Sequence, residues 1–117
     1  PYTTLFRSQA TLPPDTTSLD VADALHPTAA VAGTPTDVAV RLVAELEGVD
    51  RGRYAGPVGW MSATGDGEWM LALRSARIDD NGTVRAWAGA GIVAGSEPAR
   101  EVAETALKFR PITDALA

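Results

Sequence analysis

The chain has 117 residues, enough for one domain or part of one, and its 45 % hydrophobic and 21 % charged content is that of a soluble globular protein. Its formal net charge of −5 argues against a nucleic-acid partner, because proteins that bind nucleic acid usually present a basic face. The absence of cysteine excludes disulfides, thiolate zinc sites and a cysteine nucleophile, and no apolar run approaches the roughly 20 residues of a membrane helix. We therefore expect a cytoplasmic protein without nucleic-acid or membrane partners, whose oligomeric state the composition leaves open.

The first eight residues, PYTTLFRS, read like the in-frame translation of a sequencing-library adaptor. They contain no apolar h-region and no cleavage site, so they are not a signal peptide. We treat residues 1–8 as a non-native leader and residues 9–117 as the natural chain. We expect this natural part to be the C-terminal portion of a longer protein.

Two helices are predicted in the first half of the chain. The first spans residues 17–25, with Thr16 or Thr17 as its N-cap, and ends where a proline follows. The second spans residues 37–47, with Thr36 as its N-cap and an apolar stripe at helical spacing. A glycine directly after this stripe predicts the end of the helix.

Three strands should follow, at residues 54–63, 68–78 and 83–93. The turn sequences Thr64–Gly67 and Asp79–Gly82 separate them, and the second is a hairpin signal. The middle strand is apolar on both faces, which predicts that it is buried on both sides.

A last helix should begin after Ser96, a suitable N-cap, with Pro98 in its first turn, and Pro111 should interrupt it near its end. The predicted order is helix, helix, three antiparallel strands, helix. An antiparallel strand meander flanked by helices is an α+β fold.

The final helix carries Glu101, Glu104 and Lys108 at positions i, i+3 and i+7, which lie on one helix face. Two carboxylates there could hold Mg²⁺, a hard cation that takes oxygen ligands, and the lysine could hold an anion. The alternative is a solvated ion pair between Glu104 and Lys108, the more common role for such a spacing taken alone.

Other residues before this helix suggest a ligand site. Arg74 lies within the apolar middle strand, where a guanidinium needs a partner, either in an internal salt bridge or as a clamp on a ligand carboxylate. Gly89 and Gly91 mark a bulge, tight packing, or a close approach of the backbone to a ligand, but their spacing does not form a dinucleotide loop. Trp87 belongs to the core or forms a pocket wall. His26, the only histidine, is more often structural than catalytic in such a context.

From about residue 20 onward the chain resembles the chorismate-utilising enzymes, and in particular their isochorismate synthase branch. The resemblance rests on Leu-His-Pro-Thr and Gly-Thr-Pro within residues 25–35, on DRGRYAGPVGW at residues 50–60, and on residues 67–108. The last segment contains Gly-Ala-Gly-Ile-Val and Glu-x-x-Glu-Thr-x-x-x-Lys, a pair of motifs common to the superfamily. Ala29 and Ala32 depart from the proline and glycine that the family often has there.

The resemblance implies a fold, the C-terminal part of the α/β sandwich of these enzymes. It also implies an activity, the Mg²⁺-dependent isomerisation of chorismate to isochorismate for siderophore or menaquinone biosynthesis. The alternative within the class is a salicylate synthase or another chorismate-utilising enzyme.

The resemblance also assigns roles to single residues. Glu104 resembles a Mg²⁺ ligand, and Glu101 a nearby contributor through water. Arg74 and the backbone N–H of Gly89 resemble groups that bind a substrate carboxylate, and Lys108 resembles a second anion anchor. In the same way, His26 resembles a residue that lines the ring side of the pocket.

In the family a lysine is the general base, a glutamate is the general acid, and a further glutamate binds the metal. We expect all three to lie upstream of this chain. The parent protein is thus predicted to be an enzyme, and residues 9–117 alone to be inactive. The alternative from another class is a non-catalytic remnant or a small binding module.

Overall fold

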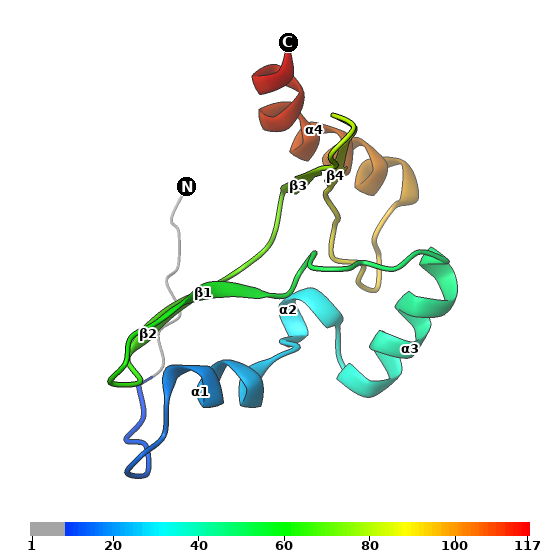
Figure 1. The fold of residues 1–117 in the computed structure, drawn as a ribbon. Coiled ribbons are helices and arrows are strands. Elements are labelled where there is room, and N and C mark those ends of the chain that lie inside the picture. The colour runs from blue at the N-terminus through cyan, green and yellow to red at the C-terminus, as the bar shows by residue number, and fades with distance from the viewer. Residues whose placement is uncertain (1–8) are drawn as a thin grey trace.

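A computed structural model describes residues 9–117 of the chain, so the adaptor-like leader at residues 1–8 lies outside the described residues (Figure 1). Helices and antiparallel strands are both present, which confirms the α+β class. In chain order the elements are α1 (Ser18–Leu25), α2 (Ala29–Ala32), α3 (Thr36–Glu47), β1 (Pro57–Met61), β2 (Gly67–Leu71), β3 (Ser75–Ile78), β4 (Val84–Trp87) and α4 (Pro98–Leu116).

Helix α1 begins with a capping box that confirms Thr17 as the N-cap. The Thr17 hydroxyl accepts a hydrogen bond from the backbone N–H of Asp20 at 3.2 Å, and the Asp20 carboxylate accepts one from the backbone N–H of Thr17 at 2.8 Å. The hydroxyl of Thr17 also donates to this carboxylate, and these bonds lower the pKa of Asp20. The helix ends at His26, as the following proline predicts.

Helix α3 differs from its prediction at its beginning. Its N-cap is Pro35, and Thr36 is the first helical residue. The Thr36 hydroxyl donates to the carbonyl of Gly33 at 3.2 Å instead of accepting from the helix. At the other end, Gly48 adopts a left-handed backbone with φ of 62°, the usual glycine stop.

Strands β1 and β2 form an antiparallel hairpin in which Val58 faces Met70 and Gly59 faces Trp69. Pro57 is the first residue of β1, a position where its missing N–H removes no ladder hydrogen bond from the strand interior. Helix α1 lies along this hairpin (Figure 1), and its first residue, Ser18, donates a backbone hydrogen bond of 2.8 Å to the carbonyl of Gly65 in the turn.

The predicted continuous strand over residues 68–78 is wrong, because the chain breaks between β2 and β3. Ala72 still donates to the carbonyl of Gly56 at 2.9 Å, but Leu73 then bonds back to Leu71 and Arg74 takes a left-handed backbone with φ of 49°. The two halves therefore join different two-stranded sheets, β1–β2 and β3–β4, instead of one meander. Burial on both faces is also wrong, since Met70 is 76 % exposed.

The last strand and the last helix also differ in their limits. Strand β4 pairs with β3 and ends at Trp87, so residues 88–93 of the predicted strand lie outside any sheet. The N-cap of α4 is Glu97, while the Ser96 hydroxyl accepts from the backbone N–H of Val93 at 3.1 Å. Pro111 does not end the helix, which runs on to Leu116.

The arrangement is open. Helix α1 accompanies β1–β2 at one end of the molecule, α4 packs on β4 at the other, and α2 and α3 lie between them on one side (Figure 1). The radius of gyration is 16.8 Å, against about 13 Å for a compact domain of this length. Among residues 9–117 only Ala32 and Ala55 are buried, whereas Leu46, Ile92 and Val102 are 74 %, 72 % and 69 % exposed. None of the helices in this range has the length and apolar character that a bilayer crossing requires.

The capping box of α1 gives a first prediction. The substitution Thr17→Ala removes the acceptor for the Asp20 N–H and should lower the free energy of unfolding by about 1 kcal/mol. Urea denaturation followed by circular dichroism measures the change. Thr16→Ala is the matched control, because it deletes a neighbouring threonine hydroxyl outside the capping box. Equal losses in the two variants would contradict the assignment of Thr17 as the cap.

Candidate functional site

Lys108 links helix α4 to the segment that follows β4. Its ammonium donates a hydrogen bond of 2.9 Å to the carbonyl of Gly89 and forms an ion pair of 2.6 Å with the Glu104 carboxylate. The lysine side chain is 24 % exposed and the glutamate 55 %. The i,i+4 ion pair that was the alternative interpretation of the sequence therefore exists. The same ammonium also forms a hydrogen bond to the glycine segment.

A pocket of 310 Å³ opens in front of this lysine. We call it the Lys108 pocket; its polar lining comes from Lys108, Arg51, Glu47 and Tyr54, with Gly89 and Ala90 on the α4 side. A side-chain carbon added to Gly89 would lie 3.0 Å from the Tyr54 hydroxyl, closer than such atoms normally approach. A glycine at this position thus lets the tyrosine reach the backbone beside Lys108.

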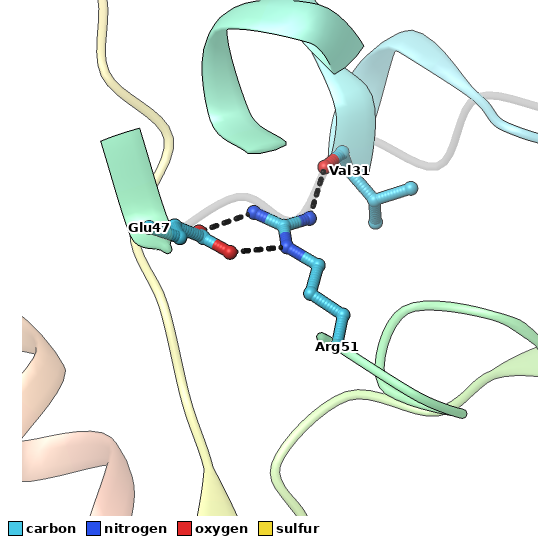
Figure 2. Close-up of polar contacts among 3 residues, drawn as sticks. All are labelled: Val31, Glu47 and Arg51. Atoms are coloured by element: carbon cyan, nitrogen blue, oxygen red, sulfur yellow. Dashed lines mark hydrogen bonds and ion pairs between the residues drawn. The ribbon is translucent and has the colours of Figure 1, made fainter. Parts of the chain in front are cut away.

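Arg51 also lines this pocket, and Figure 2 shows its guanidinium between Glu47 and Val31. Two of its nitrogens donate to the two carboxylate oxygens of Glu47, at 2.7 Å and 2.6 Å, and the third donates to the carbonyl of Val31 at 3.4 Å. The guanidinium carbon lies 5.7 Å from the centre of the Tyr54 ring, within the range of a cation–π contact. Arg51 therefore connects α2, α3 and the segment before β1.

This ion pair changes the acid–base behaviour of both partners. Hydrogen bonds from Arg51 lower the pKa of Glu47, against a smaller opposing effect of burial. The same bonds raise the pKa of Arg51 further above its ordinary value. Both groups are therefore charged throughout the neutral pH range.

A second pocket, of 410 Å³, is also lined by Arg51. We call it the His26 pocket; it shares with the Lys108 pocket the residues Val31, Glu47, Arg51, Tyr54 and Ala55. The Nδ1 atom of His26 is buried and finds no hydrogen-bond partner in the part of the chain that the structure describes. The structure thus places His26 and Lys108 in two pockets that share Arg51 and Tyr54 in their linings.

Two predicted site residues lie elsewhere. Arg74 is exposed in the link between β2 and β3, so its predicted position inside a buried strand is wrong, and it does not line the Lys108 pocket. Trp87 is half-buried at the end of β4, where it pairs with Ser75, and it does not line this pocket either. Their roles as a carboxylate clamp and a pocket wall stay predictions.

Glu101 and Glu104 both lie on α4, one turn apart, and Glu101 lines a surface hollow beside Ala90. Within residues 9–117 there is no group of three or more histidine, aspartate and glutamate side chains that could hold a metal ion. Two carboxylates nevertheless suit the way Mg²⁺ is bound in many enzymes, by one or two protein oxygens with water and substrate completing the shell. The two carboxylates therefore fit a Mg²⁺ site that water and substrate complete, and not one in which the protein supplies every ligand.

Sequence reasoning did not assign a role to Glu47, Arg51 or Tyr54. The signal was present: Glu47 and Arg51 have i,i+4 spacing across the end of α3, and Arg51 and Tyr54 lie in the DRGRYAGPVGW segment that carries the resemblance. The spacing did not reveal that Arg51 also bonds to α2, or that the pair lines the same pocket as Lys108.

Comparisons with known proteins identify the family of this chain. A family profile described as chorismate binding enzyme matches residues 5–117, so the chain belongs to the family of chorismate-binding enzymes. Among its relatives is the isochorismate synthase DhbC of Bacillus subtilis, 48 % identical over 88 % of this chain and 26 % of the relative. Another is the salicylate biosynthesis isochorismate synthase of Pseudomonas aeruginosa, 45 % identical over 84 % of this chain and 20 % of the relative.

A solved structure also matches. It is DhbC of Bacillus anthracis, assigned as a 2,3-dihydroxybenzoate-specific isochorismate synthase, with a TM-score of 0.85 and 45 % identity over 89 % of this chain and 28 % of that protein. The chain thus spans about a quarter of the length of these proteins. The resemblance inferred from the sequence is confirmed at the level of the family.

The lowered pKa of Glu47 gives a second prediction. In Arg51→Met the pKa of Glu47 should rise toward its ordinary value, because the hydrogen bonds that favour the carboxylate are lost. The stabilisation from this depressed pKa is present above the ordinary glutamate pKa of about 4.3 and is lost as the pH falls through the lower folded value. Carbon-detected NMR titration of the Glu47 carboxyl measures the shift. The control Arg41→Met, in an exposed pair on the same helix, should leave it unchanged; an unchanged pKa in Arg51→Met would contradict the assignment.

Proposed function

We propose that this chain forms part of an isochorismate synthase, a cytoplasmic enzyme that isomerises chorismate to isochorismate in a Mg²⁺-dependent reaction. The observation that carries the proposal is the Lys108 pocket, where an ammonium, a glycine backbone and a tyrosine hydroxyl converge on a space large enough for part of a small acid. The identity to isochorismate synthases over most of the chain supports the choice of substrate.

The hydrogen bonds of Lys108 leave room for a ligand. A protonated lysine has three N–H donors, and here one meets Glu104 and one meets the carbonyl of Gly89. The third donor remains for an anionic ligand oxygen. Because its two protein partners hold the ammonium in place, Lys108 can bind a substrate carboxylate without first losing the entropy of a free side chain.

We propose that Glu104 and Glu101 would hold Mg²⁺ beside this lysine. The ion would supply positive charge that binds and orients the ring carboxylate of the substrate. Glu104 would then serve two partners, the metal and Lys108. Arg74 and the N–H of Gly89 are proposed as further carboxylate-binding groups, His26 as a residue of the ring side of the pocket, and Trp87 as a wall.

Isomerisation also needs proton transfer, since water adds at one ring carbon and hydroxide leaves from another. We propose that the general base and the general acid come from the part of the relatives' length that this chain does not span. The chain alone should then bind chorismate without turning it over, and turnover by the chain alone would contradict this division.

The second candidate function is salicylate synthesis, which shares the motifs and adds elimination of pyruvate. It rests on the motifs that the two activities share, because the relative from salicylate biosynthesis is itself named an isochorismate synthase. Product analysis separates the two activities: an isochorismate synthase forms isochorismate alone, and a salicylate synthase forms salicylate with pyruvate. The product also bears on whether the pathway leads to a siderophore or to menaquinone. A non-catalytic binding module is the alternative from another class. In that case even a complete protein would bind chorismate and form no product.

A chimera tests the proposal. Residues 9–117 replace the matching quarter of Bacillus subtilis DhbC, and chromatography measures isochorismate formation. We expect turnover by the chimera, and at least about a 100-fold loss of kcat/KM in Lys108→Ala, because an electrostatic anchor for the substrate is removed. Arg100→Ala deletes an exposed cation on the same helix and should change kcat/KM little. A folded chimera that binds chorismate and forms no product would contradict the enzymatic assignment.

The metal proposal has its own test in the same chimera. Glu104→Gln replaces a charged oxygen ligand by a neutral one and should raise the Mg²⁺ concentration for half-maximal activity at least about tenfold. Glu97→Gln, an exposed carboxylate at the start of α4, is the matched control. The same Mg²⁺ requirement in both variants would exclude Glu104 as a ligand.

A further inference from the structure

The ion pair between Arg51 and Glu47 differs from an ordinary surface pair on the same helix. Arg41 and Asp37 also have i,i+4 spacing, but they approach only to 3.5 Å, and both side chains are 75 % exposed. Arg51 and Glu47 form two parallel hydrogen bonds of 2.7 Å and 2.6 Å, and their side chains are 29 % and 39 % exposed. Bidentate pairs of this kind fix the orientation of the guanidinium plane as well as its position.

The oriented guanidinium lies against one residue of the Lys108 pocket, Tyr54. Its carbon is 5.7 Å from the ring centre, and the backbone N–H of Tyr54 donates to the carbonyl of Arg51 at 2.9 Å. The part of the chain described by the structure offers no hydrogen bond to the Tyr54 hydroxyl. The ring, and with it the hydroxyl, is therefore held by packing and by the cation–π contact with Arg51.

We propose that Arg51, held by Glu47, is a positioning residue that fixes Tyr54 in the lining shared by the Lys108 pocket and the His26 pocket, with its hydroxyl at Gly89. Arg51 acts through the tyrosine ring and through the carbonyl of Val31, a hydrogen bond that connects α2 to the same lining. The consequence for ligand binding rests on the proposed function. The positioning itself does not, and it can be measured without a ligand.

The first experiment uses the 117-residue chain labelled with 3-fluorotyrosine. The chain has two tyrosines, and Tyr54→Phe identifies the fluorine resonance of Tyr54. We expect Glu47→Gln and Arg51→Lys each to shift this resonance, because the cation beside the ring is no longer held in one orientation by two parallel hydrogen bonds. Asp37→Asn makes the same chemical change in the exposed pair on α3 and should leave the resonance in place. Circular dichroism verifies that each variant is folded. If Glu47→Gln does not fold, the resonance of Arg51→Lys, which keeps the positive charge, tests the proposal. A Tyr54 resonance that stays unchanged would overturn the proposal.

The second experiment separates positioning from general support of the fold. The affinity of the same chain for chorismate with Mg²⁺ is measured by calorimetry for Glu47→Gln and Arg51→Lys, each with Tyr54 and with Tyr54→Phe. If Arg51 acts through the Tyr54 hydroxyl, each substitution weakens binding about fivefold with Tyr54 intact and less than about twofold in the Tyr54→Phe background. Equal losses in both backgrounds would overturn the proposal. Absence of chorismate binding by the unmutated chain would instead count against the proposed function, and the fluorine result would then decide on the positioning.

Discussion

The arrangement of this chain depends most on the hydrogen bonds of the Arg51 guanidinium. Its donors meet both carboxylate oxygens of Glu47 and the carbonyl of Val31, so one planar group determines how α2, α3 and the segment before β1 come together. The two buried side chains within residues 9–117 are Ala32 and Ala55. They directly follow Val31 and Tyr54, which the guanidinium contacts. Where so little apolar surface is buried, directional hydrogen bonds to a charged group carry much of the order that a hydrophobic core would otherwise provide.

The open shape of the molecule follows from the same shortage of burial. Large apolar side chains on α3, on α4 and after β4 remain exposed, Leu46, Val102 and Ile92 among them. Exposed apolar surface on this scale is typical of faces that meet another part of a protein. The chain spans about a quarter of the length of its relatives.

Those parts of the fold that depend on local chemistry were predictable from sequence. The capping box at Thr17, the glycine stop at Gly48 and the hairpin turn before β4 each follow from side-chain or backbone preferences within a few residues. The break at Arg74 could not be predicted in this way. A left-handed backbone is usually marked by glycine or asparagine, and an arginine between Leu73 and Ser75 gives no such mark.

The site shows the same division. Lys108, Glu104 and Gly89 were predicted to belong to one site because the resemblance assigns their motifs to it, and the hydrogen bond from Lys108 to the Gly89 carbonyl shows that lysine and glycine lie together. Arg51 and Tyr54 were missed because their contribution is tertiary: α3 must fold back on α2 before they face the lysine. Conversely, Arg74 was expected in a buried strand because local alternation was extended across a break that only the tertiary structure reveals.

The charges on one face of α4 have a consequence for the order in which ligands can bind. Glu101 and Glu104 carry two negative charges and Lys108 one positive charge, and the whole chain has a net charge of −5. A dianion such as chorismate meets an unfavourable field at this face until a divalent cation reverses its sign. If both bind here, thermodynamic linkage requires that the metal and the acid raise each other's affinity by the same factor. The cation alone is attracted to this face, whereas the acid alone is repelled, so the acid would bind well only where Mg²⁺ is also present.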